Sequence, residues 1–170
     1  MNTTHPNKSP LARVCAVAMC ILFAGTACAA EVGKSLPDLK GFALEGSVPA
    51  TSGKVALVDF WASWCGPCRK SFPALESLHQ RYKAQGLVVL GVSVDEDAAA
   101  MKNFLRQHAV SFSIARDASH KLAEAVKVGT MPTTLLVDRH GVIRFVHSGF
   151  HSGDDAALGR EIEQLLHDAK

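Results

Sequence analysis

The sequence predicts a single α/β domain with a mixed central β-sheet. Apolar runs at 54–61 and 87–94 have the length and the β-branched content of buried strands, and a helical pattern follows each of them. Further along, the turn at 139–141 separates two short apolar strands, which is typical of a hairpin. Alternation of strands and helices favours parallel pairing and a hairpin adds antiparallel pairing, so together they indicate a mixed sheet flanked by helices.

The first half of the domain begins with an irregular stretch at 31–52, which is punctuated by glycine and proline and is expected to hold a short hairpin. The strand at 54–61 leads into a helix that starts near Cys65 and presents apolar side chains at a spacing close to 3.6 residues. Gly86 ends this helix, and Pro73 lies inside it, where the missing N–H is expected to produce a kink.

The second half also alternates between strands and helices. The strand at 87–94 is followed by the acidic run 95–97, which is expected to open a helix because carboxylates stabilise helix N-termini. The remaining expected elements are a strand at 110–115, a helix at 119–126, strands at 133–138 and 142–147, and a final helix capped by Ser152 or Asp154. No repeat or linker interrupts this order, which indicates one domain.

The first 30 residues have the layout of a secretory signal peptide. They contain no acidic residue, carry Lys8 and Arg13 near the start, and continue as an apolar run at 14–24 followed by small residues at 25–30. A basic start, an apolar centre and a small-residue exit are the three parts of an export signal.

Cleavage is expected after Ala29 or Ala30, which divides the sequence into a signal peptide at 1–30 and a domain at 31–170. Export through such a signal would place the domain in the periplasm. Two alternatives remain open. One is an uncleaved anchor in the inner membrane, for which the apolar stretch is at the short limit of length, and the other is lipid attachment at Cys28.

Removal of the leader changes what cysteine content and charge imply. Three of the five cysteines leave with it, so Cys65 and Cys68 remain, and an even number suits the oxidising environment of an exported protein. Loss of two of the 18 basic residues leaves 16, equal to the 16 acidic residues, so the net charge falls from +2 to about zero. A neutral domain without a basic stripe argues against binding to nucleic acid.

The most informative motif is DFWASWCGPC at 59–68. It places two thiols three positions apart at the start of a helix, where they lie on one face and can close a small disulfide ring. Unpaired N–H groups and the positive end of the helix dipole stabilise a thiolate there. A redox-active dithiol is favoured over half of a zinc site, because the mature chain offers no second cysteine pair. An inert structural disulfide is the other alternative.

Several separated segments resemble a known family. Residues 58–68 look like the active-site segment of thioredoxin, and Pro73 stands where thioredoxins carry a helix-kinking proline. The segment GTMPTT at 129–134 resembles the cis-proline loop of that family. The exported TlpA/ResA-like branch is indicated by the leader and by three further segments, at 90–95, 110–126 and 137–141.

The resemblance covers about 33–170 and implies a thioredoxin fold, in which helices flank the mixed central β-sheet. Residues 110–126 would be an extra strand–helix insertion. The loop at Pro132 departs from the Gly-Ala-Pro-Glu pattern associated with reductases dedicated to cytochrome c maturation. That departure argues against assigning the chain narrowly to haem-protein maturation.

The cysteine pair divides into two expected roles. Cys65 is the expected nucleophile, because it lies nearest the helix start, and Cys68, one turn deeper, is the expected resolving thiol. Gly66 and Pro67 set the turn between them. Trp64 is expected to face partners beside the site, with a place at the edge of the core as the alternative.

Further roles come from the resemblance. It implies that Asp59 is a buried proton relay to Cys68, since burial raises a carboxyl pKa; a strand-end side chain facing solvent is the alternative. It also implies a cis bond before Pro132, which would leave the backbone of Met131 free to pair with a substrate segment. Thr130, Met131 and Pro132 are therefore the expected substrate-binding residues.

The expected function is that of an exported thiol–disulfide oxidoreductase that reduces disulfides of other periplasmic proteins, because Gly-Pro between the cysteines resembles reducing thioredoxins. The processes in which this reduction is expected to serve are the maturation of cytochrome c or of copper sites. The expected partners are exported proteins that carry disulfides and a membrane electron donor, whereas no cofactor and no bound metal are expected. The sequence does not indicate the oligomeric state.

Two alternatives to a reductase remain open. A disulfide-forming oxidase would use the same dithiol in the opposite direction. A copper-handling accessory protein would use Met131 together with the histidines of the C-terminal third, His120, His140, His147 and His151.

Overall fold

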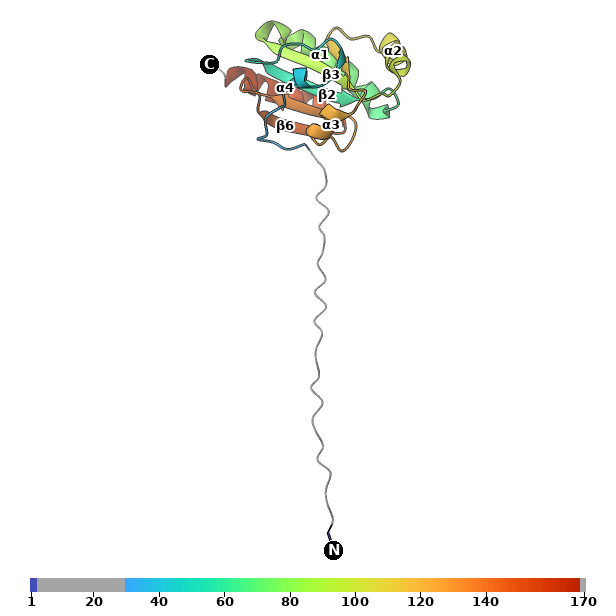
Figure 1. Cartoon of the computed structure of the whole chain (residues 1–170). Coiled ribbons are helices and arrows are strands. Elements are labelled where there is room, and N and C mark those ends of the chain that lie inside the picture. Colours follow the sequence, from blue (N-terminus) through green and yellow to red (C-terminus); the bar gives the residue numbers. More distant parts are fainter. Residues whose placement is uncertain (3–29, 169–170) are drawn as a thin grey trace.

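The chain folds into layers around a six-stranded β-sheet (Figure 1). The computed structural model describes residues 1–2 and 30–168. The expected signal peptide lies outside the described residues apart from its two ends, and so do Cys15, Cys20 and Cys28.

The sheet is mixed, as the sequence predicts. In chain order its strands are β1 (Glu45–Gly46), β2 (Val55–Trp61), β3 (Leu87–Ser93), β4 (Ser113–Arg116), β5 (Thr133–Val137) and β6 (Ile143–Ser148). In space the order is β1-β4-β3-β2-β5-β6. The pairs β2–β3 and β3–β4 are parallel, whereas β1–β4, β2–β5 and β5–β6 are antiparallel. The expected insertion is present as β4 and the short helix that follows it.

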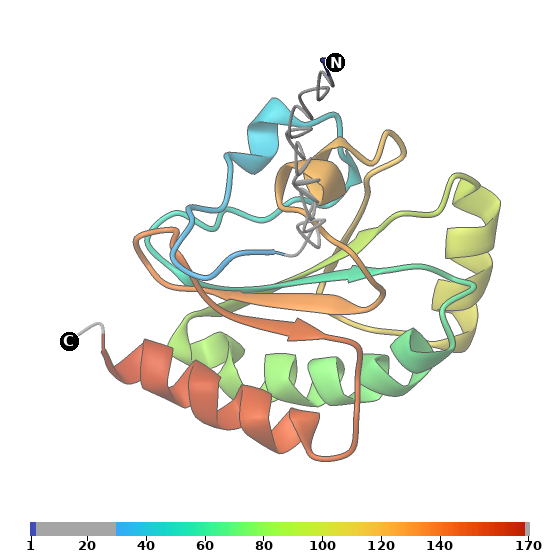
Figure 2. The ribbon, with the colours of Figure 1, turned by 90° about the horizontal axis from the view of Figure 1, so that it is seen from below.

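Helices cover both faces of the sheet. The α-helices are α1 (Gly66–Tyr82), α2 (Ala98–Gln107), α3 (Lys121–Ala125) and α4 (Asp154–His167), and two 3-10 turns, η1 (Leu39–Gly41) and η2 (Lys83–Gln85), complete the set. Figure 2 shows α1 and α4 side by side on one face, with α3 and η1 on the other. Gly86 follows η2 in the left-handed conformation that glycine adopts without strain, and the helical segment ends there as predicted.

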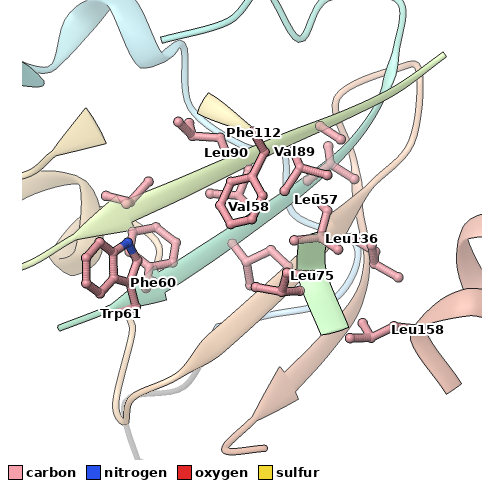
Figure 3. Close-up of a cluster of buried hydrophobic side chains, with 14 of the residues drawn as sticks. Leu57, Val58, Phe60, Trp61, Leu75, Val89, Leu90, Phe112, Leu136 and Leu158 are labelled. Atoms are coloured by element: carbon pink, nitrogen blue, oxygen red, sulfur yellow. The ribbon is translucent and has the colours of Figure 1, made fainter. Parts of the chain in front are cut away.

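The central strand β2 is buried at all seven of its residues. Its neighbours β3 and β5 satisfy its backbone on both edges, and helices cover its faces, which explains why its sequence is almost continuously apolar. At its end, Trp61 packs against Phe72 of α1 and Phe104 of α2, with ring centroids 4.7 and 4.8 Å away. Figure 3 shows Trp61 and Phe60 near one end of this strand, together with other buried apolar side chains of the core. The core is therefore anchored where β2 gives way to α1.

Of the local expectations, two are wrong and one is confirmed. The segment 31–52 forms no hairpin; instead β1 pairs with β4, at a distance along the chain that no local pattern reveals. The acidic run 95–97 does open a helix, because Asp97 is the N-cap of α2 and its carboxylate accepts the Ala99 N–H. Neither Ser152 nor Asp154 caps α4, because Gly153 occupies the cap position in the left-handed conformation.

Two glycines give a test of the packing. A Cβ at Gly91 of β3 would lie 3.2 Å from Nε1 of the buried Trp61 and 2.8 Å from Cδ1 of Ile114. We expect Gly91→Ala to lower the free energy of unfolding by about 1–3 kcal/mol, because the close-packed core cannot accommodate the methyl group. Urea unfolding measures the effect.

Gly159→Ala is the matched control. Gly159 lies inside α4, and a Cβ there would make ordinary contacts of 3.7 Å with Leu78 and Tyr82. Alanine is the better helix former, so this variant is expected to gain about 0.5–1 kcal/mol. Equal effects of the two variants would contradict the packing described for Gly91.

Candidate active site

The two cysteines lie where the central strand passes into α1. Cys65 is the N-cap residue of α1 and has an extended backbone, whereas Cys68 lies in the first turn. They form a disulfide, and the Cys65 Sγ also accepts a hydrogen bond from the Cys68 N–H at 3.2 Å. A sulfur at an N-cap receives the unpaired N–H groups and the positive dipole end of the helix. The position suits a thiolate at Cys65.

The first turn of α1 adds no opposing charge. It contains no acidic residue, and the next two residues after Cys68, Arg69 and Lys70, are basic and exposed. Cys68 is completely buried, whereas Cys65 retains a small exposed fraction of 4%. Of the two cysteines, only Cys65 at the helix end therefore retains any contact with solvent.

A tight turn connects the end of β2 to Cys65. The Cys65 N–H donates to the Ala62 carbonyl at 3.1 Å, which closes a four-residue turn with Ser63 and Trp64 at its centre. Trp64 is 70% exposed, so the alternative that places it at the edge of the core is wrong. The core tryptophan is Trp61, which is fully buried.

A surface groove of about 520 Å³ runs past the disulfide. One wall is formed by the active-site turn and the other by the loop before β5. The lining residues are Trp64, Cys65, Gly66 and Pro67 on the first wall, and Val128, Gly129, Thr130 and Met131 on the second. The groove thus brings together residues that are more than 60 positions apart in the sequence and that the resemblance assigns to one site.

Hydrogen bonds hold the loop of the second wall in place on the side away from the groove. The Met131–Pro132 bond is cis, as the resemblance implies, and Pro132 is buried. The Gly149 N–H donates to the Pro132 carbonyl at 2.7 Å, and the Thr133 hydroxyl donates to the Thr130 carbonyl at 2.8 Å. Thr130 is exposed and Met131 half-buried, so both remain accessible from the groove.

Asp59 is a carboxylic acid inside the core. It is fully buried on β2, and its Oδ1 accepts a hydrogen bond from the Thr134 hydroxyl at 2.7 Å. Its Oδ2 has no partner among the described residues. Desolvation by burial raises the pKa of Asp59 from 3.8 to about 7, against the opposing effect of the Thr134 hydrogen bond. The solvent-facing alternative is therefore wrong, and the group can change protonation near neutral pH.

Sequence reasoning missed two partners of the site. Thr134 was expected only as part of a strand, yet it holds Asp59 from the neighbouring strand β5. Asp95 was expected only to open a helix, yet its carboxylate accepts the Ser63 N–H within the active-site turn. A signal for the second contact existed, because adjacent parallel strands end at the same edge of a sheet and both residues follow such an end.

The histidines do not gather at one place. His147 pairs with Glu161 at 2.6 Å, and a ring nitrogen of His120 lies 3.0 Å from the Val94 carbonyl. His140 and His151 are exposed. Among residues 30–168, no group of three or more His, Cys, Asp or Glu side chains is arranged to hold a metal ion. Nor does the described part of the chain contain a helix long and apolar enough to cross a bilayer.

Comparison with known proteins places the chain in a family. The Redoxin family model matches residues 31–162. The chain belongs to the Redoxin family. It is 33% identical over 116 residues to the thiol-disulfide oxidoreductase ResA of Bacillus cereus, covering 66% of this chain and 67% of that one. It is 31% identical over 140 residues to ResA of Geobacillus kaustophilus, covering 81% and 79%.

A solved structure extends the likeness to the fold. A Chlorobium tepidum protein assigned as a thiol:disulfide interchange protein, DsbE, superposes with a TM-score of 0.75 at 36% identity, covering 81% of this chain and 99% of that one. The chain is therefore a thioredoxin-like thiol–disulfide oxidoreductase with a thioredoxin fold, and the predictions of fold class and enzyme class are confirmed.

The buried carboxyl group predicts a coupling between stability and pH. The pKa of Asp59 is higher in the folded state than in the unfolded chain, so its contribution is fully present below about pH 4 and is lost as pH rises through about 7. Asp59→Asn cannot ionise. We expect it to gain up to about 4 kcal/mol over the wild-type protein at pH 8, and only about 0.5 kcal/mol at pH 4. Urea unfolding across this pH range measures the difference.

The same variant is expected to slow disulfide exchange between pH 6 and 8, because a proton acceptor for Cys68 is lost. Thr134→Val removes the one hydrogen bond that lowers the pKa of Asp59, so it should move the pH profile of the wild-type reaction upward. Unchanged exchange rates in Asp59→Asn over this range would show that Asp59 is only structural.

Proposed function

We propose that this protein is exported to the periplasm and reduces disulfides in other exported proteins. The groove carries this proposal, because it is lined by Cys65 beside the exposed Trp64 and a fixed loop. A protein disulfide needs both features. Its sulfur must reach Cys65, and the chain around it must lie against a surface.

The reaction proceeds through two exchanges of sulfur. The Cys65 thiolate attacks one sulfur of a partner disulfide, which forms a mixed disulfide and releases the other partner sulfur as a thiolate. Cys68 then attacks the Cys65 sulfur. That step closes the Cys65–Cys68 disulfide and releases the second partner thiolate, so two electrons pass to the partner. A membrane electron donor returns the oxidised protein to the dithiol.

Cys68 must lose its proton before the second exchange. Burial disfavours its thiolate, and a base is needed inside the protein. Asp59 serves as this base because its pKa of about 7 leaves it partly ionised at neutral pH and able to accept a proton. The proton can then pass to a departing partner thiolate.

Recognition of the partner uses the two walls of the groove. Trp64 offers an exposed apolar surface on one side. On the other, the backbone of Thr130 and Met131 lies just before β5, so an extended partner segment can align there as an added strand. Pro132 fixes this loop from beneath, while Gly66 and Pro67 shape the turn around the sulfurs. Binding of this kind uses hydrogen bonds to the main chain of the partner more than contacts with particular side chains, so it suits partners of different sequence.

Export rests on the leader and on the extent of the domain. The family match starts at residue 31, directly after the expected cleavage site. We therefore propose that 1–30 is a cleaved signal peptide and that the domain at 31–170 works in the periplasm. Cytochrome c and copper-site maturation are the proposed settings, and the identity of the partners decides between them.

Trapping in the cell tests the function. We expect Cys68→Ser to accumulate mixed disulfides with other proteins in the periplasmic fraction, because Cys65 still attacks and the resolving thiol is gone. The control is the double variant Cys65→Ser with Cys68→Ser, which should trap none. Non-reducing gels followed by mass spectrometry identify the adducts. Absence of adducts in the single variant would refute the proposed function.

The direction of electron flow comes from the same cells. A reductase that is fed by a membrane donor should be found mainly as the dithiol when the wild-type cells are quenched with acid and labelled with a thiol reagent. A disulfide-forming oxidase should be found mainly as the disulfide. Predominant disulfide would overturn the proposed direction while leaving the exchange chemistry intact.

A further inference from the structure

We propose that Asp95 is a positioning residue, which holds the turn before Cys65 in the geometry that disulfide exchange requires. The proposal rests on the proposed function, since it assigns a supporting role for that same reaction. Asp95 lies two residues beyond the end of β3, outside the groove, and does not line the wall that faces a partner. Its effect on the cysteines is therefore indirect.

The Asp95 carboxylate is buried and fully engaged. It is 3% exposed, and three donors converge on it. The Ser63 N–H lies 3.1 and 3.0 Å from its two oxygens, the Ser63 hydroxyl donates to Oδ1 at 2.7 Å, and the Ser93 hydroxyl donates to Oδ2 at 2.8 Å. Hydrogen bonds to a charged acceptor are stronger than neutral ones, and burial strengthens them further.

The backbone of Asp95 is itself held in place. Its N–H donates to the Ser93 hydroxyl at 3.1 Å. From the neighbouring strand β4, Nη1 of Arg116 donates to the carbonyls of Asp95 and Glu96 at 3.3 and 2.6 Å. Asp95 is thus held by hydrogen bonds from two strands of the sheet, from Ser93 of β3 and from Arg116 of β4. Because the sheet is rigid, Asp95 can hold Ser63 in a fixed position. We call this set of hydrogen bonds between Asp95, Ser63, Ser93 and Arg116 the Asp95 clamp.

The residue that it holds is one of the two central residues of the active-site turn. Ser63 lies two positions before Cys65, so their Cα atoms are at most about 7 Å apart. Both polar groups of Ser63 that face the carboxylate are used, which leaves the turn little freedom to rotate. The turn sets where the Cys65 sulfur lies relative to Cys68 and to the groove.

Loss of the Asp95 clamp should make the Cys65–Cys68 disulfide less stable relative to the dithiol. The stability of the Cys65–Cys68 bond depends on the effective concentration of one thiol at the other, and a looser turn lowers that concentration. The equilibrium constant for closing the ring would fall, and the protein would become more oxidising. Attack of Cys65 on a partner would also slow, because its sulfur is less often in the reactive position.

Asp97 provides a matched control on the same loop. It is exposed, and its carboxylate caps α2 through the Ala99 N–H at 2.7 Å, with no contact to the active-site turn. Asp95→Asn and Asp97→Asn remove the same charge from positions two residues apart. A difference between them separates a geometric effect from a general change in charge.

The test compares purified proteins in two assays. Equilibration with glutathione of defined redox ratio gives the constant for ring closure, and reduction of insulin disulfides by the dithiol form gives the rate. We expect Asp95→Asn to lower the constant roughly tenfold, which corresponds to about 30 mV, and to slow insulin reduction by a similar factor. Asp97→Asn should match the wild-type protein within twofold, and circular dichroism should show that both variants are folded.

Two results with folded Asp95→Asn would count against the proposal. Wild-type values in folded Asp95→Asn, or equal effects of both variants, would overturn it. If Asp95→Asn does not fold, Ser63→Ala decides, because it removes only the 2.7 Å hydroxyl bond; a smaller fall in the constant supports the proposal and no change overturns it. Failure of the wild-type protein to reduce insulin would instead contradict the proposed function.

Discussion

Complete burial of the central strand is the constraint on which the rest of the structure depends. With all seven residues of β2 inside the protein, the chain can emerge only at the two ends of that strand. At the carboxyl end, Trp61 packs against Phe72 of α1 and Phe104 of α2 and holds the strand in place just before the turn. The four residues that follow then place Cys65 at the start of α1. Packing of the core thus sets the position of Cys65, and the N-terminus of α1 stabilises its thiolate.

The same burial raises the pKa of Asp59. A carboxyl group in an apolar strand is costly, and the cost is expressed as this raised pKa. One hydrogen bond from Thr134 offsets part of the cost, and the second oxygen has no partner among the described residues. A core optimised for stability alone would place an apolar side chain there. The stability lost at neutral pH is therefore consistent with the proton-transfer role that we propose for Asp59, since perturbed pKa values gather at functional sites.

Much of the fold could be predicted because its patterns are local. The strands β2 and β3 and the start of α1 appear within a residue or so of their expected limits, since continuous apolar runs and 3.6-residue spacing report burial directly. Contacts between distant segments left no such pattern. The pairing of β1 with β4 depends on the approach of Gly46 to the Ile114 carbonyl, where a Cβ would lie only 2.7 Å away.

The candidate site shows the same division. The cysteines, Trp64 and the loop at Pro132 were singled out because short motifs contain them, and the structure brings them to one groove. The Asp95–Ser63 contact escaped detection because its partners belong to different strand ends, 32 positions apart. Short motifs single out the cysteines and the residues beside them, whereas the Asp95–Ser63 contact could be anticipated only by combining the ends of two adjacent parallel strands.

The most direct test of this account is the order in which the two thiols of the reduced protein react with a limiting alkylating reagent. The account predicts that Cys65 is modified first and that its reaction persists below the ordinary cysteine pKa of about 8.5, because the helix end stabilises its thiolate. Mass spectrometry of the singly modified protein across pH 5 to 9 locates the label. Preferential labelling of Cys68, or a Cys65 reaction that begins only above pH 8.5, would contradict the account.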